Sequence, residues 1–84
     1  MDSCMITFRS VTPAQRGELL LRRSGIGCVI HRTPHVLAEQ GCGYCLDVHR
    51  SQLQMALELL RSKGIPFRKA YCTDQEGKPR EIPL

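Results

Sequence analysis

The sequence predicts an α+β fold, a ferredoxin-like β-α-β-β-α-β sandwich in which two helices cover one face of a four-stranded antiparallel sheet. A chain of 84 residues can bury one modest hydrophobic core and is too short for two. Residues 19–30 resemble residues 58–69, because each segment runs from an amphipathic helix end through Gly and Ile into a short strand. The four expected strands are residues 5–9, 27–32, 44–48 and 67–72.

The first helix is expected over residues 13–24. Thr12 suits the N-cap and Pro13 the first helical position, because the fixed φ of proline fits a helix start. Gly25 can take the left-handed conformation that ends a helix. The inner face is expected to comprise Ala14, Gly17, Leu20 or Leu21, and Ser24.

The second helix is expected over residues 51–63, with Ser51 or His49 as its cap. Gly64 repeats the helix-ending role of Gly25, and Pro66 prevents the helix from resuming. The apolar positions that follow the i, i+3, i+4, i+7 rule are Leu53, Ala56, Leu57 and Leu60.

The folded part is expected to be a single domain over residues 1–72. Residues 73–84 contain two prolines and a glycine and have no hydrophobic period. We therefore expect them to form a mobile or partner-dependent tail.

Composition and charge exclude several classes of partner. The net charge of +4 comes from basic residues spread along the chain, with no basic run interleaved with aromatic residues, so no nucleic-acid partner is expected. The apolar stretch at residues 5–8 is too short for a signal sequence or membrane span. We expect a cytoplasmic protein without a membrane partner, in which the five cysteines are mostly free thiols.

Strand alternation assigns the cysteines to faces of the sheet. Cys45 and Asp47 should point to the face without helices, because Tyr44, Leu46 and Val48 are the apolar positions of their strand.

The other three cysteines outside the central turn are expected to be structural. Cys28 is interpreted as a small buried hydrophobe. Cys4 begins the first strand and Cys72 ends the last, and these two strands should be neighbours. We interpret both as residues of frayed strand ends.

The most distinctive motif is the turn Gly41-Cys42-Gly43-Tyr44-Cys45. Glycine carries no side chain, so a partner can approach a thiol that has glycine on both sides. Cys42 should be more exposed than Cys45, and Arg32, His31 or His35 could supply the positive charge that favours a thiolate.

These residues resemble the putative selenium/sulfur carrier-like family of small bacterial domains. The resemblance covers roughly residues 5–72 and rests on the Gly-Cys-Gly turn at 41–43, the strand after it, and the repeated helix ends at Gly25 and Gly64. It implies that Cys42 carries a persulfide or selenopersulfide between donor and acceptor proteins. Cys45 departs from the family pattern and is a candidate resolving thiol. Gly41, Gly43, Arg32 and His35 are the candidate binding residues.

Two other classes of function remain open. Cys42 and Cys45 have the spacing of half a zinc site, to which His31, His35, His49 or Cys72 could contribute, and two chains could share a metal in a homodimer. The same pair could form a thiol redox module, although strand geometry strains a 42–45 disulfide.

The remaining alternative is an interaction domain without chemistry. The sequence has no Ser/His/Asp set, no pair of catalytic carboxylates and no glycine-rich phosphate loop. We therefore expect a carrier or accessory protein rather than an enzyme, and no cofactor.

Overall fold

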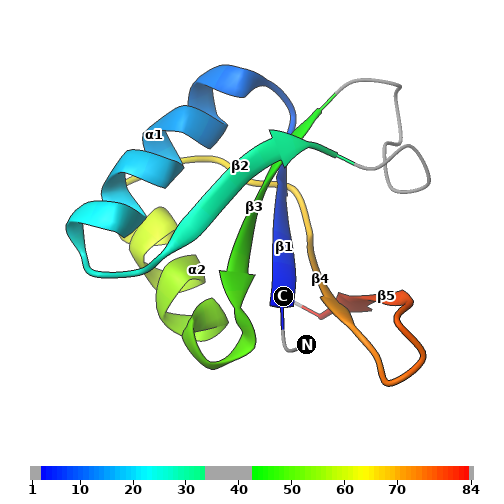
Figure 1. Cartoon of the computed structure of the whole chain (residues 1–84). Helices are drawn as coiled ribbons and strands as arrows, with labels where there is room; N and C mark the ends of the chain where they lie inside the picture. Colours follow the sequence, from blue (N-terminus) through cyan, green and yellow to red (C-terminus); the bar gives the residue numbers. More distant parts are fainter. Residues whose placement is uncertain (1–2, 34–42, 84) are drawn as a thin grey trace.

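The computed structural model describes residues 3–33 and 43–83 (Figure 1). Within them the chain forms two α-helices and a five-stranded antiparallel sheet, which is an α+β fold. The elements in chain order are β1 (Ser3–Phe8), α1 (Val11–Arg23), β2 (Cys28–Arg32), β3 (Tyr44–His49), the 3-10 turn η2 (Arg50–Gln52), α2 (Leu53–Ser62), β4 (Ala70–Thr73) and β5 (Pro79–Ile82).

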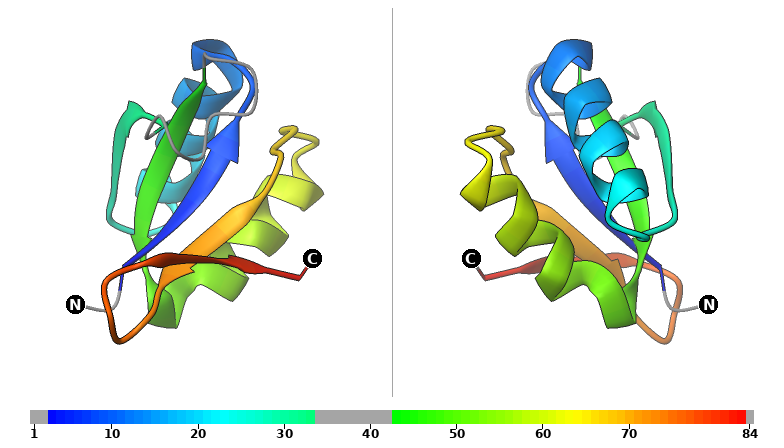
Figure 2. Two further views of the ribbon diagram at one scale, coloured as in Figure 1. Left: turned by 90° about the vertical axis from the view of Figure 1, so that its right-hand side faces the viewer. Right: turned by 90° about the vertical axis from the view of Figure 1, so that its left-hand side faces the viewer.

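The sheet has the strand order β2-β3-β1-β4-β5, and every neighbouring pair is antiparallel. Both helices cover the same face of this sheet (Figure 2). The expected count of four strands is wrong, because β5 pairs with β4 through four residues, from Ala70↔Ile82 to Thr73↔Pro79. Whether residues 73–84 depend on a partner stays a prediction.

The core lies between the helices and the face of the sheet that they cover. Helix α2 buries the four apolar positions that its period predicts, Leu53, Ala56, Leu57 and Leu60. Helix α1 buries Ala14, Gly17 and Leu21, while Leu20 packs at the edge of the core. Strand β1 contributes Cys4, Ile6 and Phe8 to the same cluster.

Gly17 allows helix α1 to approach its neighbours closely. A Cβ at this position would lie 3.1 Å from Leu60 Cδ2, 3.3 Å from Leu46 Cδ1 and 3.4 Å from Phe8 Cζ. These three atoms belong to α2, β3 and β1. Gly17 therefore lies where both helices and the sheet pack together, and a side chain at this position would crowd that contact.

The internal repeat corresponds to two helix ends of the same construction. Gly25 and Gly64 have φ of 83° and 68°, which is the left-handed region that glycine adopts without strain. After Gly25, the Ile26 N–H donates to the Leu21 carbonyl at 2.8 Å. After Gly64, the Ile65 N–H donates to the Leu60 carbonyl at 2.9 Å, so each helix ends in a Schellman motif. Both isoleucines are buried, so each helix end also fixes a core residue.

Both helices begin with a cap other than the one that the sequence indicates. Helix α1 begins at Val11 with Ser10 as N-cap, so the expected cap at Thr12 is wrong. Pro13 lies two positions further inside than expected, which is tolerated because N–H groups of the first turn have no intrahelical partner.

Helix α2 begins at Leu53 with Gln52 as N-cap, so the expected cap at Ser51 or His49 is wrong. His49 instead caps the preceding turn η2, where it accepts a hydrogen bond from the Ser51 N–H at 3.2 Å.

Strand β4 begins three residues later than the expected strand 67–72. The Thr7 N–H donates to the Lys69 carbonyl, and the Arg68 N–H donates to the Thr7 carbonyl, both at 2.8 Å. The Lys69 N–H instead donates to the Thr7 hydroxyl at 3.0 Å. Two residues therefore face one across the strands, as in a bulge, and the regular ladder starts only at Ala70. No helix among the described residues is long and apolar enough to cross a membrane.

Candidate functional site

A cysteine, a histidine and an aspartate meet on the face of the sheet that the helices leave open. His31 of β2 and Cys45 of β3 are directly opposed in the antiparallel ladder. Asp47 lies two residues after Cys45 and therefore on the same face. The expectation from strand alternation that Cys45 and Asp47 share this face is confirmed, and His31 joins them through the register. The three donor atoms lie within 4.8 Å of one another.

Both ring nitrogens of His31 have acceptors. Nε2 lies 2.8 Å from Asp47 Oδ1, and Nδ1 lies 2.8 Å from the Arg32 carbonyl oxygen. Burial alone would lower the pKa of His31, but the hydrogen bonds to Asp47 and Arg32 and the charge of Asp47 together raise it. An oxygen acceptor beside each ring nitrogen favours the form that is protonated on both nitrogens.

The Cys45 sulfur lies over the His31 ring, within contact distance of both ring nitrogens. The sulfur is 3.3 Å from Nε2 and 3.5 Å from Nδ1. The closer partners of these two nitrogens are the oxygens of Asp47 and Arg32. Cys45 is 0% exposed, and this burial, with the nearby charge of Asp47, raises the pKa of its thiol to about 12. Cys45 is therefore a neutral thiol in this state.

Thr33 borders the same cluster. Its Oγ1 is buried and has no hydrogen-bond partner of good geometry among the described residues. It nevertheless lies where it could donate to a Cys45 thiolate, which lowers the pKa of Cys45 and partly opposes the effect of burial.

Three of the residues predicted for binding or transfer, Gly41, Cys42 and His35, lie outside the described residues. Gly43 is described, and its carbonyl accepts a hydrogen bond from the Thr33 N–H at 3.0 Å. A Cβ on Gly43 would lie 3.1 Å from the Phe8 carbonyl oxygen, so the strand needs glycine there to approach β1. The exposed Arg32 guanidinium lies 5.8 Å from the centre of the Tyr44 ring, a cation–π contact at the same end of the sheet.

Cys28 has the structural environment that its position predicts. It is 6% exposed, and its Sγ donates to the Glu18 carbonyl at 3.8 Å. Burial raises the pKa of its thiol, against the opposing charge of Arg22.

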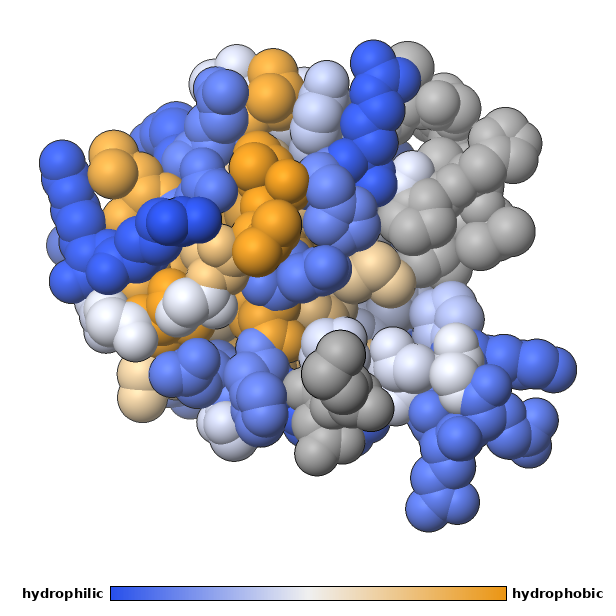
Figure 3. All heavy atoms as spheres, in the orientation of Figure 1, coloured by the Kyte–Doolittle hydropathy of each residue, from blue (hydrophilic) through white to orange (hydrophobic). Residues whose placement is uncertain are grey.

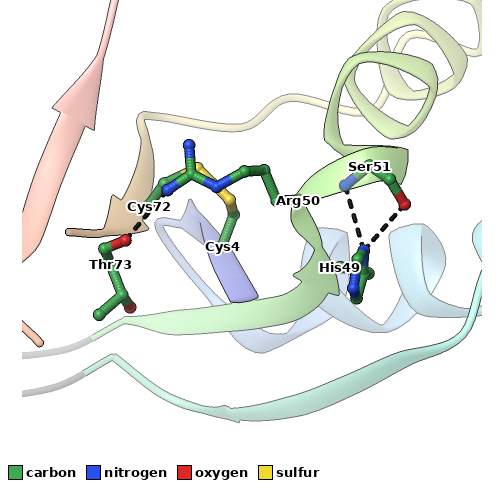
Figure 4. The surroundings of a disulfide bond; sticks show 6 residues. All are labelled: Cys4, His49, Arg50, Ser51, Cys72 and Thr73. Carbon is green, nitrogen blue, oxygen red and sulfur yellow. Dashed lines mark hydrogen bonds between the residues drawn. A yellow bond between two sulfur atoms is a disulfide. The ribbon is translucent and has the colours of Figure 1, made fainter. Parts of the chain in front are cut away.

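Cys4 and Cys72 form a disulfide, so their interpretation as free thiols at frayed strand ends is wrong (Figure 4). They are opposed in the β1–β4 ladder, with Cα atoms 4.1 Å apart, and both are almost fully buried. The Arg50 side chain extends past the disulfide to donate to the Thr73 carbonyl at 3.0 Å, which links β4 to the turn η2 that precedes α2. Flanking contacts of this kind hold the strand ends in place.

Two of the metal ligands considered from the sequence are engaged elsewhere. His49 Nδ1 contacts the Ser51 hydroxyl at 2.8 Å and caps η2. Cys72 is in the disulfide. Asp47 was not considered as a ligand, although its place two residues after Cys45 indicated that both side chains share one face.

Comparisons with known proteins give one result. A search of curated proteins and a search of solved structures found no match. A family model described as "Putative Se/S carrier protein-like" matches residues 3–72, which span β1 to β4 and include all five cysteines. The chain therefore belongs to the putative selenium/sulfur carrier-like family.

Proposed function

We propose that this protein carries sulfur or selenium on Cys42, as a persulfide or selenopersulfide, and passes it from a donor protein to an acceptor protein. Membership of the carrier-like family supports the general role. The ferredoxin-like arrangement expected from the sequence would serve as a rigid support for the carrier thiol.

The environments of the other four cysteines carry the assignment to Cys42. A carrier thiol must ionise and must be reached by two partner proteins in turn. Cys4 and Cys72 are joined in a buried disulfide, and Cys28 and Cys45 are buried thiols with raised pKa values. None of these four meets both requirements, which supports the proposal that Cys42 is the carrier.

The transfer needs no oxidant or reductant beyond the donor persulfide. The Cys42 thiolate would attack the outer sulfur of the donor's persulfide, forming a new S–S bond as the bond to the donor cysteine breaks. The donor thiolate leaves and is protonated, and Cys42 holds the persulfide. An acceptor nucleophile would repeat this exchange and restore the Cys42 thiol.

The chain directly after Cys42 is fixed to the sheet, which suits a thiol presented to partners. Gly43 is held by the Thr33 N–H and packs against the Phe8 carbonyl. It leads into β3, which lies inside the sheet between β2 and β1. Cys42 thus comes immediately before a segment that is anchored to a central strand of the sheet.

Sulfur loading of Cys42 tests the proposal. The full chain is incubated with a cysteine desulfurase and cysteine, and its intact mass is measured without reductant. We expect the mass to increase by one sulfur atom, at a site that peptide mapping assigns to Cys42. Cys42→Ser should abolish the increase.

Cys28→Ser is the matched control, because it also removes one thiol but leaves the expected carrier in place; it should load like the wild type. Loading that survives in Cys42→Ser, or that maps to Cys28 or Cys45, would overturn the assignment. Selenocysteine can replace cysteine as the desulfurase substrate, so that the donor cysteine carries selenium at the same oxidation level as the persulfide sulfur and the two elements can be compared.

A further inference from the structure

We propose that His31, Cys45 and Asp47 form a metal site that holds one Zn²⁺ and leaves a fourth position open. The site is separate from the carrier role of Cys42, and its three ligands come from the facing strands β2 and β3. Three protein ligands with one open position are the usual arrangement of zinc sites that bind a further ligand.

The first support is the spacing of the donor atoms. Zinc bond lengths in a tetrahedral site place neighbouring S, N and O ligands about 3.3–3.6 Å apart. The Cys45 sulfur is 3.3 Å from His31 Nε2 and 3.5 Å from Nδ1, so it lies over the ring, and Nε2 is 2.8 Å from Asp47 Oδ1. To share an ion with Nε2, the sulfur would have to move from above the ring toward the Nε2 side. An outward movement of the Asp47 carboxylate, which is 39% exposed, would open the space for the ion.

The second support is the orientation of the His31 ring. A histidine that binds zinc through one nitrogen usually donates its other N–H to a carbonyl or carboxylate. His31 Nδ1 is 2.8 Å from the Arg32 carbonyl oxygen, so the ring already presents Nε2 to Asp47. Zinc would replace the Nε2 proton and leave the contact with Arg32 intact.

The third support is charge balance. Zinc binding would release the Nε2 proton and the Cys45 thiol proton to solvent, and the thiolate and the Asp47 carboxylate would together neutralise the ion. A mixed sulfur, nitrogen and oxygen set suits zinc better than calcium or magnesium, which prefer oxygen ligands.

The test uses Co²⁺ as a spectroscopic probe and Zn²⁺ as its competitor. Full-length protein treated with a chelator is titrated with Co²⁺, and the absorption of a thiolate–cobalt bond is followed. We expect one Co²⁺ per chain, displaced by one Zn²⁺. Cys45→Ser should remove the thiolate band, and Asp47→Asn should weaken binding by at least about 10-fold, the lower end of what even an indirect partner contributes.

Two matched cysteine variants separate this site from other thiols. Cys28→Ser and Cys42→Ser should each bind Co²⁺ like the wild type. The proposal is overturned if the wild type binds no Co²⁺, or if Cys42→Ser loses the band, since the Cys42–Cys45 pair would then hold the ion. Should Cys45→Ser fail to fold, Asp47→Asn decides the question, because unchanged affinity in that variant contradicts the site.

Failure of this proposal can be distinguished from failure of the carrier proposal. The cobalt titration contains no sulfur donor, and sulfur loading of Cys42 can be measured on chelator-treated protein.

Discussion

The side chains around each cysteine decide what that cysteine can do. Cys28 and Cys45 are both buried thiols, yet only Cys45 contacts a histidine, at 3.3 Å from its Nε2. The Cys28 sulfur instead donates to the main-chain carbonyl of Glu18 at 3.8 Å and packs in the core. Because burial raises the pKa of both thiols, neither is a good nucleophile at neutral pH.

This difference in environment predicts the order of alkylation. Cys42 should react with iodoacetamide faster than Cys28 or Cys45 in the native protein, because the latter two are buried and protonated. Peptide mapping after timed quenching would give the three rates. Equal rates for Cys42 and Cys28 in folded protein would contradict the prediction, whereas equal rates in urea are the expected control.

For individual residues, the sequence predicted which face of the sheet a side chain occupies, but not which residues of neighbouring strands contact each other. Alternation placed Cys45 and Asp47 on one face because side chains along a strand repeat every two residues. It could not pair His31 with Cys45, since that register depends on the length and path of residues 33–43 and not on either strand's own pattern. The Cys4–Cys72 neighbourhood was expected, but their burial depends on packing that strand order alone does not indicate.

Among the elements, the β4–β5 hairpin is the one that periodicity missed. Every residue of β5 except Ile82 is exposed, and it begins with Pro79, so it has no buried face to create an alternating pattern. Proline is tolerated because β5 is an edge strand. The signal lay in the turn, where Asp74 precedes Gly77, which has a φ of 81°. The helices were predictable because each buries one continuous apolar face.

The Asp74 carboxylate predicts that this hairpin is sensitive to acid. It accepts hydrogen bonds from the N–H groups of Lys78 and Glu76 and from Arg80 Nε, all at 2.9 Å. The Lys78 N–H and then the Arg80 side chain lower the pKa of Asp74, against a smaller opposing effect of burial. Because the pKa is lowered on folding, the ionised Asp74 carboxylate stabilises the hairpin. This stabilisation is complete above the ordinary pKa of 3.8 and is lost as the pH falls through the folded-state pKa.

We therefore expect amide protection in β5 to fall as the pH drops through this range, while protection in β1 and β3 persists. Asp74→Asn should reduce β5 protection at neutral pH and remove its acid dependence. Hydrogen exchange followed by NMR measures both effects. Unchanged β5 protection in Asp74→Asn would show that the hairpin is held by other contacts.

For the whole molecule, the sheet has two different edges. Figure 3 shows hydrophobic side chains over the region of β2, and Val29 on this edge strand is 60% exposed. The opposite edge, β5, is mostly polar and exposed. If two chains associate by strand pairing, β2 is the edge with apolar surface to bury. The dimer itself stays a prediction.

The disulfide predicts a large effect of reductant on global stability. Cys4 and Cys72 are 68 residues apart in the sequence, and closing a loop of this size restricts the unfolded chain by about 4 kcal/mol. Reductant should therefore lower the free energy of unfolding of the wild type by about this amount, which appears as a lower urea midpoint. A Cys4→Ala/Cys72→Ala double variant should unfold at a low midpoint with or without reductant, whereas Cys28→Ser should respond to reductant like the wild type. A wild-type midpoint that ignores reductant, with the thiols verified as reduced, would contradict this.

The same bond changes how the molecule would respond to a pulling force. Tension applied between the two chain ends would pass from β1 to β4 through the Cys4–Cys72 bond, leaving residues 5–71 as a covalently closed, unloaded ring. Only the segment after Cys72, including β5, would lengthen under the load. An unfolding motor that threads chains from one end would have to accommodate two strands of this ring side by side, or wait for a reductant to open it.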